Sequence, residues 1–465
     1  MGIPTPVALT TQLVCEATRG RVTAGDSTRV FAGVSTDTRT IGRDVLFIAL
    51  RGERFDGHSF AAQAASEGAA GVLVSTPVEA GAATVIVVDD TLVALQDLAR
   101  RVRRASGAIV VAITGSAGKT TTKEITADLL ALRYRVFRNA GNLNNHIGLP
   151  LSLIELRQGP ELAVVELGMN HAGEISLLVD IAAPDVRLWT NVGDAHIGHF
   201  GSREAVAAAK AEIFEGASVE TVAVVNADDP LVMRHVSTFP GQRLTFGESE
   251  GADVRASAVI DRGFDGTAAT VTTPKGTIDL EVPLPGRAHL SNVLAAVAVA
   301  VHFDVPLAAI AERVATVRPV SRRGGSTSGP SGLRVVDDSY NASPAAVRAA
   351  LSALASTRTS GRRIAVLGEM LELGSSATAL HESCGRAVAE LGIDVLVAIG
   401  GPPVDALVAG AVAAGMAAAH VHRFVDSASA AEAISRLVAA GDLVLVKGSR
   451  GSRTDLVADR LREVA

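Results

Sequence analysis

AITGSAGKTTT, residues 112–122, decides the fold of this chain. The stretch ends a continuous apolar run, as expected for a strand buried in a parallel sheet. Gly115 and Gly118 let the chain turn tightly after this strand, so that backbone N–H groups can point at a phosphate. Lys119 can place its charge on the outer phosphates of a nucleotide, and Thr120 can offer its hydroxyl to Mg²⁺. The stretch predicts a strand, a phosphate-binding loop and a helix.

The loop is a variant of the usual phosphate-binding pattern. GxxxxGK[ST] requires glycine at position 113, where this chain has Ile113, so the first glycine stands closer to the lysine. The alternative is an ordinary glycine-containing turn that is followed by Lys-Thr-Thr by chance. The order of strand, loop and helix argues against this alternative, because it is the order that a phosphate-binding loop requires. We expect the phosphates of a nucleotide to be bound by seven consecutive residues: Gly115, Ser116, Ala117, Gly118, Lys119, Thr120 and Thr121.

Two later strand ends carry candidate ligands for the divalent metal that such a site needs. Glu166 ends the apolar strand AVVELG, at the edge where open α/β sheets bind ligands. His196 follows in NVGDAHIGH with His199 three residues on, but no thiolate or third histidine accompanies them, as zinc would require. We expect Glu166 and His196 to help Thr120 hold Mg²⁺. A solvated carboxylate and a hydrogen-bonded loop histidine are the alternatives.

Lys210 lies on a helix predicted over residues 202–215, among small apolar neighbours. Ser202 is a suitable N-cap for this helix, and Gly216 suits the position after its last turn. The pattern fits either an exposed helical lysine or a partly buried one.

Strands and helices alternate along most of the chain, which predicts an α/β protein with a doubly wound central domain. The first ~100 residues form a small α/β unit of their own. Shorter alternating segments over residues 243–283 predict an antiparallel appendage. The most loop-like segment is 321–332, and we place a domain boundary near it. The expected domains are residues 1–100, 101–319 and 320–465.

Composition limits the function classes. The chain has 465 residues, which at ~150 residues per domain suggests about three domains. Hydrophobic residues make up 48%, enough for several cores. The 43 basic and 49 acidic residues give a net charge of −6, which disfavours a nucleic-acid-binding or membrane-surface protein. Aromatic residues, at 3%, are too few for base-stacking platforms.

Neither disulfides nor membrane segments are expected. Cys15 and Cys384 lie far apart and outside any CxxC pattern, which argues against a disulfide framework and against structural zinc. The N-terminus has no basic segment before an apolar run. The weakly polar stretch 406–419 is short and broken by glycines, so it predicts a packed helix and not a membrane span. We expect a soluble cytoplasmic protein.

Long motifs in a fixed order resemble one family. GSAGKTT, the strand ending in Glu166, NVGDAHIGHFGS and AAKAEIFEG are similar to motifs of the Mur ligases of peptidoglycan synthesis. Five further stretches resemble the members that add a dipeptide: residues 141–153, 164–175, 337–351, 367–374 and 446–451. The resemblance runs from about Ser35 to Arg453. At Ala117 relatives often have Asn or Ser, a departure of little consequence where backbone amides hold the phosphate.

The resemblance implies a three-domain Mur ligase architecture. An N-terminal domain would bind a UDP-sugar, a central P-loop-type domain would bind ATP, and a C-terminal Rossmann-like domain would close over the nucleotide. The family's UDP-sugar stretch matches Ser35, Thr36, Asp37 and Arg39. The C-terminal domain shows no dinucleotide site of its own, because AVLGEMLELG lacks GxGxxG spacing.

The resemblance also implies roles around the nucleotide. Lys119, Thr120, Glu166 and His196 match phosphate and Mg²⁺ positions. Asn292 matches the family's adenine contact, and Asp338 matches its ribose-side aspartate. Either Arg322 or Arg323 matches the arginine that contacts phosphate. Lys210 matches a lysine that several relatives carry as a carbamate, which bridges to a second Mg²⁺.

The implied activity is ATP-dependent ligation of D-alanyl-D-alanine to UDP-N-acetylmuramoyl-tripeptide, in cytoplasmic cell-wall precursor synthesis that supports cell shape and division. The cofactors would be ATP and Mg²⁺, and the protein would act as a monomer without nucleic acid or membrane insertion. Another amino-acid-adding Mur ligase is the alternative within the family, although a diaminopimelate-adding relative should show a DNP string that is absent here. A regulatory P-loop ATP-binding protein is the alternative outside it.

Overall fold

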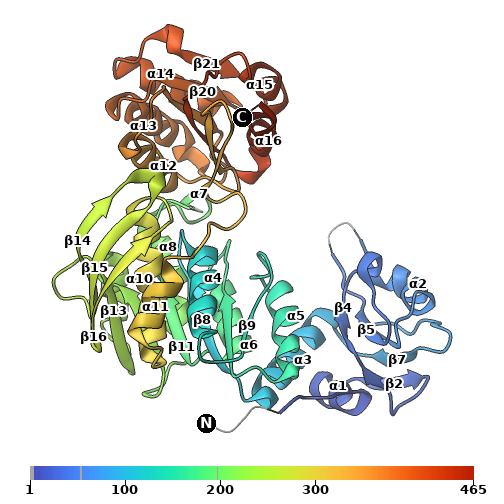
Figure 1. Ribbon diagram of the computed structural model, residues 1–465. Coiled ribbons are helices and arrows are strands. Elements are labelled where there is room, and N and C mark those ends of the chain that lie inside the picture. Colours follow the sequence, from blue (N-terminus) through green and yellow to red (C-terminus); the bar gives the residue numbers. More distant parts are fainter. Residues whose placement is uncertain (1–4, 53–54, 196, 465) are drawn as a thin grey trace.

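The computed structural model describes residues 5–52, 55–195 and 197–464, which form three large sheets with their own helices (Figure 1). A fourth, two-stranded sheet pairs β1 (Leu9–Thr10) antiparallel with β3 (Val30–Phe31). The N-terminal sheet is parallel except for its first strand, which pairs antiparallel with β7. Its strands are, in spatial order, β2 (Arg21–Ala24), β7 (Thr84–Val87), β6 (Gly71–Val74), β5 (Val45–Ile48) and β4 (Gly33–Ser35). Helix α2 (Ala61–Ser66) packs against β6.

The central sheet has nine strands. Their order is β16 (Gly276–Val282), β15 (Thr267–Thr273), β14 (Val254–Asp261), β13 (Gln242–Gly247), β12 (Val222–Asn226), β11 (Val186–Trp189), β8 (Ile109–Thr114), β10 (Leu162–Glu166) and β9 (Val136–Arg138). The run from β9 to β14 is parallel, and only β14–β15–β16 pair antiparallel. The antiparallel expectation for 243–283 was therefore wrong for β13, whose Leu244 and Phe246 extend the buried parallel sheet.

Successive side chains of β8 enter opposite cores, as the two-residue period of a strand requires. Val110 and Ala112 pack in a core with residues of α3 (Thr91–Ser106), α5 (Gly148–Ile154), α6 (Glu174–Ala182), α8 (Arg203–Ala211) and α9 (Pro230–Val236). Val111 and Ile113 pack on the other face with residues of α4 (Lys119–Leu130), α10 (Gly286–His302) and α11 (Leu307–Val314). Helices on both faces explain the continuous apolar run, and the doubly wound α/β prediction is confirmed.

The C-terminal sheet has six strands, in the order β17 (Gly325–Ser328), β18 (Arg334–Asp338), β22 (Leu443–Lys447), β19 (Arg363–Gly368), β20 (Val395–Ile399) and β21 (Val421–Phe424). All pairs are parallel except β17–β18. The loop expected over 321–332 thus contains an edge strand. Its Gly, Ser and Thr residues carry no apolar signal, because β17 is mostly exposed and pairs on one side only.

Helices cover both faces of this sheet as well. α12 (Pro344–Ser356), α13 (Ala377–Glu390) and α14 (Pro402–Ala413) share one core, and α15 (Ser427–Ile434) and α16 (Asp455–Val464) share the other. Of the stretch 406–419 that was expected to be a packed helix, residues 406–413 belong to α14, and the chain turns out of that helix after Ala413. In the described part of the chain, no helix is long and apolar enough to cross a membrane.

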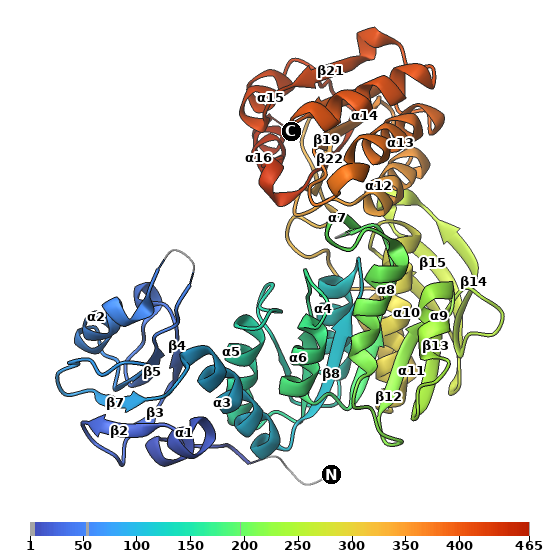
Figure 2. The same cartoon turned by 180° about the vertical axis from the view of Figure 1, so that it is seen from behind.

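The central and C-terminal domains contact each other at several places, and Figure 2 shows the C-terminal domain above one end of the central sheet. At one of these contacts, Phe264 N donates to Thr357 Oγ1 at 2.7 Å. At another, Gly198 N, on α7 (Ile197–Phe200), donates to Glu372 O at 3.1 Å. Between the N-terminal and central domains, α3 runs unbroken across the boundary expected at residues 100/101. It packs against α1 (Thr11–Thr18) and α5.

Two glycines bring α13 and α14 into backbone contact. A Cβ on Gly385 would lie 1.8 Å from Leu407 O, and one on Gly410 would lie 2.2 Å from Glu382 O. Side chains at these positions would force the helices apart.

Gly385→Ala should lower the free energy of unfolding by about 1–3 kcal/mol, because the clash outweighs the gain of about 1 kcal/mol in helix propensity. Thermal or urea unfolding measures this effect. Gly251→Ala is the matched control, because a Cβ added to Gly251 would meet no heavy atom within 4 Å. Equal stability of the two variants would contradict the close helix contact.

Candidate active site

The phosphate loop is shaped by two close approaches. Gly118 is the N-cap of α4 with φ 82°, and a Cβ there would lie 2.1 Å from Asn292 Oδ1. Gly115 has φ 151°, and its Cβ would lie 1.9 Å from Thr190 Oγ1. Both positions therefore need glycine for space as well as for backbone conformation. Asn292, expected near adenine, packs directly against the loop.

Asn191 braces this loop from the end of the neighbouring strand. Its carbonyl accepts from Ser116 N at 3.0 Å, and its side chain exchanges two hydrogen bonds with Ala117, at 2.9 and 3.1 Å. Two of the amides that were expected to hold phosphate are thus already engaged. The next four N–H groups have no acceptor among the described residues: those of Gly118, Lys119, Thr120 and Thr121. Together with the N-terminus of α4 they form an anion site.

Lys119 points back over the loop, where its Nζ donates to Gly115 O at 2.7 Å. Burial lowers the pKa of Lys119; Glu166 opposes the shift and Arg323 adds to it. A bound phosphate would replace one neutral acceptor with a charged one, which favours the ammonium form.

Glu166 ends β10 beside the loop and is 2% exposed. Its Oε2 accepts from Thr120 Oγ1 at 2.7 Å, and its Oε1 accepts from Asn144 Nδ2 at 2.7 Å. Asn139 holds the backbone, because its Oδ1 accepts from Glu166 N at 3.1 Å. The roles of Asn139 and Asn144 were not predicted from the sequence, although Asn144 lies in the family-like stretch 141–153 and Asn139 lies two residues before it.

The donor set fits magnesium better than a transition metal. In the described part of the chain, no group of three or more His, Cys, Asp and Glu residues could hold a metal ion by itself. Magnesium usually takes one or two protein carboxylates and completes its shell with water and substrate phosphate. The Thr120 hydroxyl and the Glu166 carboxylate, side by side at the phosphate loop, satisfy that need.

Lys210 is buried on α8, whose N-cap is Ser202 as predicted, with Ser202 Oγ accepting from Ala205 N at 3.1 Å. Burial lowers the pKa of Lys210 well below its usual value; Lys119 adds to the shift and Glu166 opposes it. Among the described residues, Lys210 makes neither a hydrogen bond nor an ion pair. A buried amine without a partner favours its neutral form.

His196 lies outside the described residues. Its predecessors Asp194 and Ala195 line the cleft above the phosphate loop. Asp194 lies between Arg203 of the central domain, at 3.8 Å, and Arg348 of the C-terminal domain, at 3.6 Å. The imidazole of His199 faces His171, with ring centroids 5.6 Å apart.

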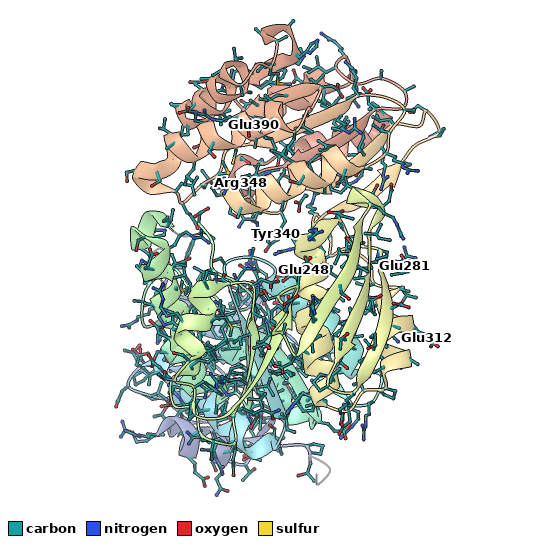
Figure 3. All side chains as sticks on the ribbon, turned by 90° about the vertical axis from the view of Figure 1, so that its left-hand side faces the viewer. Glu248, Glu281, Glu312, Tyr340, Arg348 and Glu390 are labelled. Carbon is teal, nitrogen blue, oxygen red and sulfur yellow. The ribbon has the colours of Figure 1, made fainter. Side chains whose placement is uncertain are left out.

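A cleft of about 1060 Å³ separates the phosphate loop from the C-terminal domain. Figure 3 shows Tyr340 and Arg348 on the lower side of that domain, toward the central domain. The guanidinium carbon of Arg323 lies 4.1 Å from the centroid of the Tyr340 ring. Lys447 Nζ lies 2.6 Å from Asp338 Oδ2. The cleft is lined by Arg323, Asp338, Tyr340, Lys447 and Arg348.

The sequence left open which of two adjacent arginines faces the nucleotide. Arg323 lines the cleft, whereas Arg322 pairs with Asp459 at 3.0 Å on α16. The geometry therefore favours Arg323 as the phosphate contact.

The stretch expected to bind a UDP-sugar lies apart from this cleft, on the N-terminal domain. Asp37 accepts from Arg39 N at 3.0 Å, and the Arg39 guanidinium forms a two-pronged pair with it. Hydrogen bonds from Arg39 lower the pKa of Asp37 to about 2. Ser35 Oγ accepts from Asp37 N at 3.2 Å, and Thr36 lies between them. Arg39 is largely exposed, with 86% of its side chain accessible.

Comparison with known proteins identifies the family that has this architecture. Three family descriptions match in succession: the Mur ligase family catalytic domain over residues 30–103, the Mur ligase middle domain over 113–300, and the Mur ligase glutamate ligase domain over 322–450. The UDP-N-acetylmuramoyl-tripeptide–D-alanyl-D-alanine ligase of Bacillus subtilis is 36% identical over 93% of this chain and 94% of its own length. The chain belongs to the Mur ligase family.

Solved structures agree with this assignment. MurF from Acinetobacter baumannii matches with a TM-score of 0.89 and 32% identity, covering 98% of this chain and 99% of that one. MurF from Thermotoga maritima, solved in complex with ADP, matches with a TM-score of 0.80 and 29% identity, covering 93% and 98%. This Mur ligase is an ATP-dependent enzyme of the three-domain type, and the predicted fold class is confirmed.

The Asn191 brace predicts a nucleotide-binding defect. Asn191→Ala removes both side-chain hydrogen bonds to Ala117, so the Kd for ATP should rise about tenfold, as expected for the loss of about 1–1.5 kcal/mol. Isothermal titration calorimetry measures this affinity, and the thermal midpoint checks that the fold is intact. An unchanged Kd would show that the loop keeps its shape without the brace.

Proposed function

We propose that this Mur ligase joins D-alanyl-D-alanine to UDP-N-acetylmuramoyl-tripeptide, with ATP as the energy source and in the cytoplasm. The observation that carries the proposal is the cleft in which a phosphate loop and Glu166 face Arg323, Lys447 and Asp338 of a separate domain. The names of the relatives supply the substrates, and the near-complete coverage of both chains supports the transfer.

The reaction needs activation because a carboxylate is a poor acyl donor toward an amine in water. The terminal carboxylate of the tripeptide attacks the γ-phosphorus of ATP, which gives an acyl phosphate and ADP. The free amine of the dipeptide then attacks the acyl carbon, and phosphate leaves as the amide forms. An acyl phosphate hydrolyses easily, so a cleft closed between two domains protects it from water.

The chain's own groups stabilise charge on the moving phosphoryl group. Lys119 supplies a cation, and the amides at the start of α4 supply hydrogen-bond donors at its oxygens. Thr120, Glu166 and His196 are proposed to hold Mg²⁺, which when bound neutralises phosphate charge and orients the phosphate oxygens.

The outer contacts are proposed from the family motifs, and the positions of Arg323 and Asp338 in the cleft support two of them. Arg323 reaches the nucleotide phosphate from the C-terminal domain, Asp338 the ribose, and Asn292 the adenine side of the loop. The UDP moiety binds on the N-terminal domain through Ser35, Thr36, Asp37 and Arg39. One chain supplies all these groups, so a monomer suffices.

Lys210 is proposed to carry a carbamate. Its neutral amine adds to the carbon of CO₂ and loses a proton, which converts a buried group without a partner into a carboxylate-like ligand. Lys119 would favour the negative charge of the carbamate, whereas burial and the Glu166 carboxylate would oppose it, so a bound Mg²⁺ would have to balance the charge.

The proposed function predicts that ADP release under multiple turnover requires both UDP-N-acetylmuramoyl-tripeptide and D-alanyl-D-alanine. A coupled ADP-release assay should show no such turnover with a UDP-muramoyl dipeptide acceptor or without the dipeptide. ADP release that is indifferent to D-alanyl-D-alanine would contradict ligation and favour a regulatory ATPase. Preference for a shorter acceptor and a single amino acid would indicate a different Mur ligase.

Lys119→Ala serves as the inactive control in that assay, with kcat about 100- to 1000-fold lower and an intact fold. Lys275→Ala is its matched partner, because Lys275 pairs with Asp304 far from the cleft and should leave the rate unchanged.

Chemical rescue tests the carbamate. Lys210→Ala should lower kcat about 10- to 100-fold, as loss of a supporting metal ligand does. Formate or acetate should restore part of the rate by occupying the vacated space, whereas chloride at equal ionic strength should not. The absence of rescue by any short carboxylate would count against the carbamate.

A further inference from the structure

Arg322 lies in the linker between the central and C-terminal domains, directly before Arg323. Its φ of 59° is a left-handed conformation that residues with a Cβ seldom adopt. The backbone is held on both sides of this turn, because Tyr340 N donates to Arg322 O at 3.1 Å and Gly324 N donates to Asp337 O at 2.8 Å. The linker therefore enters the C-terminal domain as a hydrogen-bonded turn that leads into β17.

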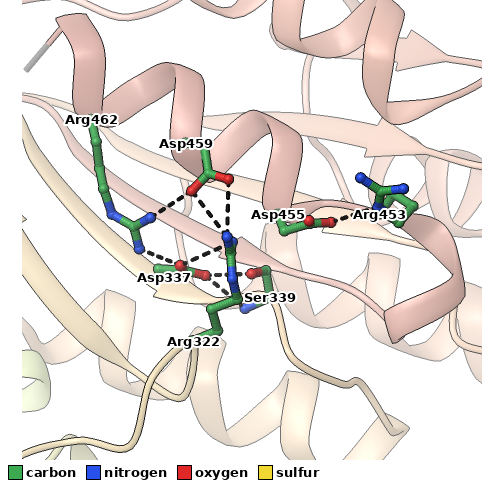
Figure 4. Close-up of polar contacts among 7 residues, drawn as sticks. All are labelled: Arg322, Asp337, Ser339, Arg453, Asp455, Asp459 and Arg462. Atoms are coloured by element: carbon green, nitrogen blue, oxygen red, sulfur yellow. Dashed lines mark hydrogen bonds and ion pairs between the residues drawn. The ribbon is translucent and has the colours of Figure 1, made fainter. Parts of the chain in front are cut away.

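The side chain of Arg322 turns away from the cleft into a network of two arginines and two aspartates (Figure 4). Its Nη2 donates to both carboxylate oxygens of Asp459, at 3.0 and 3.2 Å, and its Nη1 lies 3.6 Å from Asp337 Oδ2. Arg462 pairs with the same two carboxylates. The charges of the network balance, and it ties the linker to α16.

Asp337 is the buried member of this network, with 2% of its side chain exposed. Its Oδ1 accepts from Ser339 N at 3.0 Å and from Ser339 Oγ at 2.5 Å. Arg462 still pairs with Asp337 when Arg322 is replaced, so replacement does not strand a buried carboxylate. An Arg322 variant should therefore fold.

The neighbouring Arg323 side chain goes the other way. It lies over the Tyr340 ring and lines the cleft. Its positive charge contributes to the lowered pKa of Lys119 at the phosphate loop. Apart from its contact with Tyr340, the Arg323 side chain has no hydrogen bond to another described residue, so its direction depends on the ring and on the backbone that carries it. That backbone is held by Arg322 from the side away from the cleft.

We propose that Arg322 is a positioning residue, whose ion pairs with Asp459 and Asp337 fix the linker so that Arg323 stays over Tyr340 and reaches the nucleotide phosphate. The inference rests on the proposed contact between Arg323 and ATP. Two adjacent arginines thus do different work: one contacts the ligand, and the other sets its direction through the backbone.

Direct ATP binding in the presence of MgCl₂, measured by calorimetry on the full-length protein, tests this assignment. Arg323→Met should raise the Kd for ATP about tenfold, as loss of a charge-assisted contact does. Arg322→Met should raise it about fivefold, and Asp459→Asn similarly, within the range expected for coupled residues. Because Arg322 acts through Arg323, the double variant should bind ATP no more weakly than Arg323→Met alone.

Arg453→Met is the matched control. Arg453 also has a left-handed φ, of 57°, and also pairs with an aspartate of α16, Asp455, at 3.2 Å, but it does not contact the linker (Figure 4). It should leave the Kd for ATP unchanged. Arg322→Lys, which keeps one ion pair, should recover part of the affinity, and the KM for D-alanyl-D-alanine should stay constant in all single variants.

Three results would overturn the assignment. An Arg322→Met affinity equal to that of Arg453→Met would show that the network does not act on the site. Multiplicative effects in the double variant would show that Arg322 acts independently of Arg323. An unchanged affinity in Arg323→Met would remove the phosphate contact itself. None of these depends on which peptide the enzyme extends, so they are separate from a failure of the ligation assay.

Discussion

The hydrogen bond of 2.7 Å from Thr120 Oγ1 to Glu166 Oε2 is the contact on which the site depends. It exists because β8 and β10 are adjacent and parallel, so that the loop after one strand and the last residue of the other meet at the same edge. Asn191 reaches the same edge from β11 on the other side of β8. The order of three central strands thus places the phosphate loop, its brace and its carboxylate together.

The C-terminal domain supplies part of the charged lining of the cleft above the phosphate loop. The net charge of −6 disfavours general binding of polyanions, yet the cleft gathers cations from both domains: Lys119, Arg203, Arg287, Arg323, Arg348, Lys447 and Arg450. Several are paired with carboxylates of the cleft or its rim, as Lys447 is with Asp338. Phosphate recognition here is therefore a local property of the cleft. The net charge of the whole chain disfavours nucleic-acid binding, but it gives no information about a local site for ATP.

Local signals in the sequence sufficed for the strand, loop and helix around Gly115 and for the alternating α/β pattern, because burial on both faces leaves a continuous apolar run. The family motifs extended this to three domains. The brace by Asn191 could not be foreseen, since it depends on which strands are neighbours in space. The choice between Arg322 and Arg323 also stayed open, because a single left-handed residue in the linker decides which side chain faces the cleft.

The central claim is that a carboxylate is activated by phosphoryl transfer between the two domains. Oxygen-isotope transfer tests it most directly. With ¹⁸O in both oxygens of the terminal tripeptide carboxylate, a complete reaction with ATP and D-alanyl-D-alanine should release inorganic phosphate that carries one ¹⁸O atom, while the new amide keeps the other. Phosphate free of the label, with ligation still proceeding, would contradict an acyl phosphate and with it the role assigned to the cleft.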